Sequence, residues 1–110
     1  MKLPGAERAF VDERKLVHYC LNPAHPRGRN KARVFLSALG FTESSVPIVR
    51  AALLEAVLAR DAVSGEIDEH GRRFTVDLPI IAPSGDAMVR SIWIIRTGED
   101  FPRLVSCYIV

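Results

Sequence analysis

Apolar residues recur at helical spacing in the first half of the chain and at alternate positions in the second half. Between residues 12 and 62 they lie three or four residues apart, which is typical of amphipathic helices. From residue 66 onward apolar and polar residues alternate, which is typical of strands with one buried face. Because the helical part precedes the strands, the pattern predicts an α+β fold: three N-terminal helices packed on a three- to four-stranded antiparallel β-meander.

Local signals set the limits of the predicted helices, which span 12–21, 28–39 and 44–62. Asp12 is a good N-cap for the first helix, since its side chain can accept from a main-chain N–H that has no helical partner. Gly40 is a typical residue to end the second helix, because glycine adopts the left-handed conformation at low cost.

Four segments of the second half are predicted strands, at 66–69, 72–82, 87–96 and 103–110. A Pro-Ser-Gly-Asp turn signal separates the two middle strands. Pro79 lies inside one of these strands and predicts a bulge or an unpaired stretch there, because proline cannot donate to the ladder.

The loop lengths give an expected register for the sheet. A turn flanked by residues 82 and 87 places Trp93 opposite Val76, and the following loop places Trp93 opposite Ser106. The helices would then cover the face that carries Trp93 and Val76. The other face would carry Ile92, Ile94, Val105, Cys107 and Ile109. That face is apolar enough to favour a partner or a second copy of the chain.

The composition narrows the class of protein. A chain of 110 residues is long enough for one domain, so 1–110 is interpreted as a single domain. The net charge is only +2, so a nucleic-acid role requires clustered cations. The sequence has neither a membrane-length apolar run nor a signal-peptide pattern, and we expect a cytoplasmic protein with no membrane partner. Cys20 and Cys107 are expected to be small buried hydrophobes, and we expect no metal and no cofactor.

Cations gather between residues 22 and 35, in the segment NPAHPRGRNKARVF. Two prolines and a glycine fix the start of this segment, and a helix is predicted to follow. The segment contains His25, Arg27, Arg29, Lys31 and Arg33. Arg27 and Lys31 are four residues apart, as are Arg29 and Arg33, so the cations form two short ridges on the helix. Such a surface suits an anion, and a nucleic acid is the first polyanion to consider.

Four stretches of the chain resemble the DUF6883 family, a bacterial domain of unknown function, and related modules at the C-termini of polymorphic toxins. These stretches are residues 22–35, 68–74, 89–93 and 98–108. The related modules are regarded as metal-independent ribonucleases similar to the barnase, EndoU, colicin and RelE group. The resemblance therefore implies a toxin-like domain that cleaves or binds RNA, with RNA and a cognate antitoxin or immunity protein as partners.

The same resemblance implies roles for individual residues. His25 and Lys31 match the family motif HPxGxxKA, Arg73 matches the arginine of YGxR, and Ser106 matches the polar residue of PRLxTxY. These four are the candidate catalytic residues, since metal-free RNA cleavage needs a base, an acid and cations near the phosphorane. The candidate binding residues are Arg27, Arg29, Arg33, Ser91, Arg103 and Tyr108.

Two departures from the family pattern bear on activity. Asn30 stands where similar sequences often have histidine, and His70 stands where they often have tyrosine. If a histidine at position 30 were the general base, this chain would be a weak or inactive copy. The second hypothesis is therefore a non-catalytic interaction module of a toxin–antitoxin-like pair, able to form a homodimer through the exposed sheet face.

Overall fold

A computed structural model describes residues 1–110, except for the side chain of Tyr19. The elements are α1 (Glu13–Lys15), continued by a π-helical turn (Leu16–Cys20), α2 (Arg29–Leu39), α3 (Val46–Ala59), β1 (Val63–Asp68), β2 (Gly71–Ala82), β3 (Gly85–Arg96) and β4 (Arg103–Ile109). Short 3-10 turns lie at Ala6–Arg8 and Glu43–Ser45. The four strands form one antiparallel sheet in the order β1-β2-β3-β4.

The predicted α+β class and antiparallel sheet are confirmed, but the helices are arranged differently. Two of them lie near the N-terminus, whereas the third, joined to its 3-10 turn, occupies residues 43–59 in the middle of the chain. Asp12 caps the first helix as predicted, since its carboxylate accepts from the Arg14 main-chain N–H at 3.0 Å. After one turn that helix becomes π-helical, which its amphipathic spacing does not reveal.

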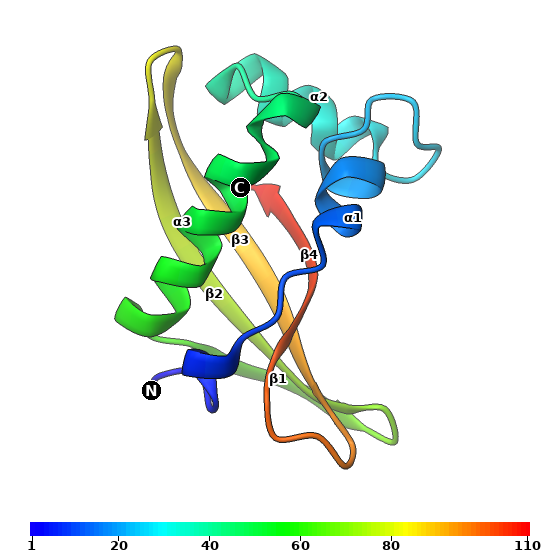
Figure 1. The fold of residues 1–110 in the computed structure, drawn as a ribbon, viewed down its shortest axis with the longest axis vertical. Helices are drawn as coiled ribbons and strands as arrows, with labels where there is room; N and C mark the ends of the chain where they lie inside the picture. Colours follow the sequence, from blue (N-terminus) through cyan, green and yellow to red (C-terminus); the bar gives the residue numbers. More distant parts are fainter.

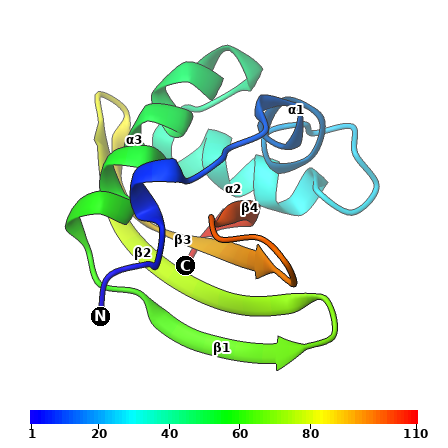
Figure 2. The ribbon, with the colours of Figure 1, turned by 60° about the horizontal axis from the view of Figure 1, so that its bottom comes forward.

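The helices cover one face of the sheet, and the opposite face is called here the outer face (Figures 1 and 2). Figure 2 shows α2 above β4 and α3 above β2. The covered face carries Phe74, Val76 and Trp93, which are all buried, so the predicted core face is confirmed.

The turn between β2 and β3 is tighter than predicted. Ala82 pairs with Gly85 across a two-residue loop, and Gly85 has a φ of 155°, which other residues rarely adopt. The register therefore moves by two residues, and Trp93 lies opposite Phe74 instead of Val76. Because side chains alternate with a period of two, this shift leaves every side chain on its predicted face.

A bulge between β3 and β4 corrects the second predicted register. Trp93 pairs with Leu104 and not with Ser106, because the loop closes between Ile94 and Arg103. Beyond that pair Ile92 lies opposite Ser106, so Val105 is an extra residue in β4. The extra residue turns Cys107 toward the helices, where it is fully buried. The prediction that Cys107 lies on the exposed face is therefore wrong.

Pro79 does not interrupt the sheet. β2 pairs with β3 without a break from Gly71 to Ala82, so of the two predicted alternatives the bulge is wrong, and Pro79 is unpaired on the side of β1. The pairing of β1 with β2 extends only to Thr75. Pro79 thus lies where β3 is the neighbour of β2 in the described chain, and a residue without an N–H is tolerated at such an edge.

Candidate functional site

The loop before α2 is held by the side chain of His25. Its Nδ1 accepts from the main-chain N–H groups of Arg27, at 3.0 Å, and Gly28, at 2.9 Å. Its carbonyl accepts from the N–H of Arg29, the first residue of α2, at 2.9 Å. With Nδ1 used as an acceptor, the neutral ring carries its proton on Nε2. The ring is therefore arranged to donate from Nε2, and it fixes the path of the chain into α2.

Lys31 connects α2 to β4. Its Nζ donates to Ser106 Oγ at 3.1 Å and lies 5.3 Å from the centre of the Tyr108 ring. A cation over an aromatic ring is attracted by the negative face of the π-system. These three residues are called here the Lys31 cluster. Lys31 is 75 or more positions from the other two in sequence, and the fold brings it to them.

The other cations of the segment lie differently from Lys31. The side chains of Arg27, Arg29 and Arg33 are exposed, and so is that of Asn30 beside Lys31. Lys31 is half-buried against β4. The three arginines therefore present charge to solvent, where a polyanion can reach them, but Arg29 and Arg33 are two residues from Lys31 and lie on another side of α2.

Two buried thiols lie next to the Lys31 cluster. Cys20, from the π-helical turn, and Cys107, from β4, are both fully buried and reduced, so their predicted burial is confirmed. A hydrogen bond from the Cys107 thiol lowers the pKa of Cys20, helped by the Ser106 hydroxyl and the charge of Lys31. The same thiol pair and burial raise the pKa of Cys107. The sequence does not predict this contact, because it depends on the bulge in β4.

Cys20 is expected to ionise at a lower pH than an ordinary thiol, and Cys107 at a higher pH. The Cys107 thiol hydrogen-bonds the Cys20 thiolate, so ionisation of Cys20 is favoured. The measurement is a titration of thiolate ultraviolet absorbance in the folded protein. Cys107→Ala should raise the pH of the first ionisation step, and Cys20→Ser should remove that step. Survival of the early step in Cys20→Ser would contradict the assignment.

Arg73 and Arg103 lie near the Lys31 cluster but belong to separate ion pairs. They share one register row, with a single β3 residue between them. Arg73 Nη1 lies 2.8 Å from Asp68 Oδ2, and Arg103 donates twice to Glu99, at 2.9 and 2.8 Å. The row that holds Arg73 and Arg103 and the row that holds Ser106 of the Lys31 cluster are two residues apart along β3, which is roughly 7 Å. The predicted cations therefore come together only in part.

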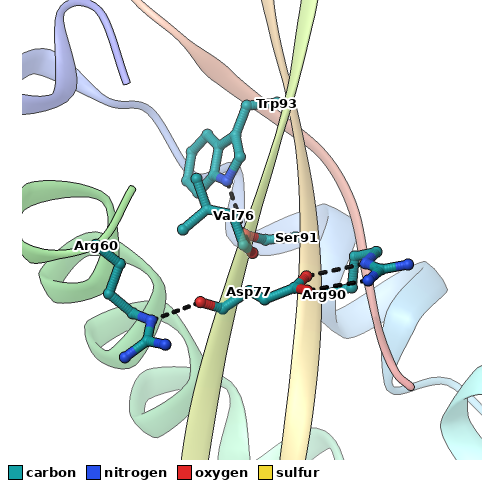
Figure 3. A network of polar contacts seen from close by, with 6 residues as sticks. All are labelled: Arg60, Val76, Asp77, Arg90, Ser91 and Trp93. Atoms are coloured by element: carbon teal, nitrogen blue, oxygen red, sulfur yellow. Dashed lines mark hydrogen bonds and ion pairs between the residues drawn. The ribbon is translucent and has the colours of Figure 1, made fainter. Parts of the chain in front are cut away.

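Ser91 belongs to the core of the domain. It is 0% exposed, its hydroxyl donates to the Val76 carbonyl at 2.6 Å, and it accepts from Trp93 Nε1 at 2.9 Å (Figure 3). The hydroxyl thus satisfies two buried polar groups, and its burial keeps it away from a ligand bound at the surface.

The sequence interpretation missed a polar group on β2 and β3. Arg90 donates to both carboxylate oxygens of Asp77, at 2.9 and 3.0 Å, and this pairing lowers the pKa of Asp77. Arg60 Nε donates to the Asp77 carbonyl at 2.6 Å (Figure 3). Tyr108 pairs with Arg90 in the sheet, so this group continues into the Lys31 cluster. Alternation along β2 places Asp77 on the polar face, but finding Arg90 opposite it requires the correct register.

Two further properties of the described residues bear on function. Their His, Cys, Asp and Glu side chains form no group of three that could hold a metal ion. Within the described chain, every helix is too short or too polar to cross a membrane.

Comparisons with known proteins identify a family and a shared fold. A solved structure described as a contact-dependent growth inhibition toxin–immunity protein complex, from Klebsiella pneumoniae 342, contains a similar chain, with a TM-score of 0.70 and 16% identity. The match covers 91% of this chain and 98% of that chain, and at this identity it shows the fold alone. No curated protein matches the sequence. The family model described as domain of unknown function DUF6883 matches residues 2–110, so this chain belongs to the DUF6883 family.

Proposed function

We propose that this domain is a toxin-like module that binds RNA and cleaves it without a metal ion. The observation that carries the proposal is the Lys31 cluster. It joins a cation of α2 to two hydroxyl-bearing residues of β4, beside the loop that His25 holds. A cation and hydrogen-bond donors at one point of the surface are what a phosphate requires.

Each part of the cluster has a role in RNA cleavage. Lys31 supplies positive charge to the phosphorane, and the Tyr108 hydroxyl donates to a phosphate oxygen. The Ser106 hydroxyl, which is buried, accepts from Lys31 Nζ and holds the ammonium in place. His25 carries its proton on Nε2, so we assign its ring to a hydrogen bond from Nε2–H to a phosphate oxygen. Solvent water takes the 2′-hydroxyl proton and protonates the leaving oxygen. Arg73 acts as a further phosphate contact when its carboxylate partner is displaced.

The fold supports a toxin-related context for this chemistry. The similar solved chain comes from a structure described as a contact-dependent growth inhibition toxin–immunity protein complex. The likeness extends over 91% of the present chain, so the elements that carry the Lys31 cluster lie within a fold found in that complex.

The enzymatic part of the proposal is tested with purified domain, a mixture of cellular RNAs and an excess of metal chelator. Cleavage that continues in the chelator and leaves 2′,3′-cyclic phosphate ends is expected, because the 2′-hydroxyl is the attacking group. RNA that stays intact across many substrates contradicts cleavage. Binding is then measured separately, and its affinity should fall as salt rises.

A second candidate function is binding to a cognate toxin or immunity protein. The favouring observation is that the similar fold occurs in a complex of two such proteins. Light scattering of the domain alone and after co-expression with the product of an adjacent gene tests this function. A stable complex of defined mass supports it, and a domain that forms no complex with that product contradicts it.

A further inference from the structure

A groove on the outer face begins where the Lys31 cluster ends. It is lined by Arg60, Asp61, Val63, Thr75, Asp77 and Arg90, and has a volume of about 510 Å³. Arg60 follows the last residue of α3. Its Nε donates to the Asp77 carbonyl, at a point of β2 that lies past its pairing with β1 (Figure 3). The groove therefore joins the end of α3 to the middle of the sheet.

The sheet register connects this groove to the Lys31 cluster in a single row. Asp77 pairs with Arg90, and Arg90 pairs with Tyr108, whose ring lies under Lys31. The row crosses three strands, roughly 10 Å from the first strand to the third. With the groove added, the row leads from Lys31 of α2, over Arg90, to Arg60 after α3.

The charge of the groove favours an anion. Arg90 neutralises the Asp77 carboxylate, with the two side chains 40% and 37% exposed. Asp61 lies 3.8 Å from the Lys2 ammonium and 3.5 Å from the N-terminal amine. Arg60 donates from Nε to a neutral carbonyl, so this hydrogen bond does not neutralise its charge. The lining itself carries two arginines and two aspartates, and Lys2 beside Asp61 adds the excess positive charge that a phosphate in the groove would meet, together with the Thr75 hydroxyl.

We propose that this groove is a second phosphate-binding position, and that a single-stranded RNA crosses the outer face from Lys31 over Arg90 to Arg60. The proposal rests on the RNA-binding function proposed above and adds the path of the strand. Val63, which is 68% exposed in the lining, offers an apolar contact to a sugar or base. A ligand too short to leave the Lys31 cluster does not reach Arg60.

The test compares two lengths of labelled 2′-O-methyl oligouridylate, which cannot be cleaved through the 2′-oxygen. One is a dinucleotide, and the other has about ten nucleotides, within the usual range for single-strand binders. Fluorescence anisotropy is measured over a range of salt. Arg60→Gln should weaken binding of the long ligand roughly tenfold, lower its logarithmic salt slope by about 0.7, and leave the dinucleotide unchanged. Arg60→Lys should keep the salt slope, since it keeps the charge.

The control is Arg50→Gln, because Arg50 also belongs to α3 but pairs with Glu13 of α1. It should bind both ligands as the unmodified domain does. Suppose that Lys31→Gln weakens binding of the long ligand and Arg60→Gln does not. The second position would then be overturned, and the proposed RNA function would stand. If Arg60→Gln weakens binding of both ligands equally, or if Arg60→Lys lowers the salt slope, Arg60 acts only by supporting the sheet, and the second position is overturned. Absence of binding by the unmodified domain would overturn both proposals.

Discussion

Lys31→Met should reduce the rate of RNA cleavage by about 10²- to 10³-fold while the domain remains folded. Methionine has a similar length and apolar stem, so the substitution removes the ammonium that lies 3.1 Å from Ser106 Oγ and over the Tyr108 ring. Loss of one preorganised group that stabilises transition-state charge has an effect of this size. The measurement is the single-turnover cleavage rate at fixed salt, with circular dichroism to verify the fold.

Lys15→Met is the matched control for this variant. Lys15 also reaches from a helix to β4, where its Nζ lies 3.5 Å from the Val105 carbonyl, but it lies outside the Lys31 cluster. Its substitution should leave the cleavage rate close to that of the unmodified domain. Lys31→Arg should retain part of the activity, because the charge remains and its geometry changes. Equal losses in the Lys15 and Lys31 variants would show a general effect of charge and contradict a local role.

Periodicity alone predicted the fold class and the buried face of the sheet, because both depend on patterns that survive small errors. The first turn is two residues tighter than expected, and Trp93 still faces the core, since a shift of two preserves the alternation. The inserted Val105 has the opposite effect, because one extra residue moves Cys107 from the exposed face to the core. A bulge is set by packing and main-chain pairing that residue types in β4 do not reveal.

The candidate site was predictable to the extent that single residues carry motifs. Lys31 and Ser106 were selected by family resemblance, and the fold brings them into hydrogen-bonding distance. Resemblance also selected Ser91, which the structure places in the core. Arg60 lies outside the stretches that resemble the family, and Arg90 lies within one of them but was given no role there; both are singled out only by contacts of the folded chain. Residues of this kind are found from tertiary pairing and not from the sequence.

His25 illustrates the same limit. It was selected by its match to the family motif HPxGxxKA and by the cations around it. The two N–H groups that point at Nδ1 could not be foreseen, since they depend on the fold of the loop. They change the expected chemistry of the ring from acceptor to donor.

Trp93→Ala should lower the free energy of unfolding by about 3–5 kcal/mol, as large-to-small changes of buried aromatic residues do. Trp93 is fully buried at the centre of the sheet, between Phe74 on β2 and Leu104 on β4. Its loss also leaves the Ser91 hydroxyl without the indole donor. Urea denaturation gives the change in unfolding free energy, and a domain of this size has only about 5–15 kcal/mol to lose.

Trp93→Phe separates the two causes of that loss. Phenylalanine keeps an aromatic ring in the core and removes only the Nε1–H that donates to Ser91 Oγ at 2.9 Å. Its cost should be smaller, about 1–3 kcal/mol for the lost hydrogen bond and the smaller ring. Because Ser91 still donates to the Val76 carbonyl, its own buried donor stays satisfied in this variant. If Trp93→Ala and Trp93→Phe lower the free energy of unfolding equally, the hydrogen bond to Ser91 stabilises the domain and the burial of the ring does not.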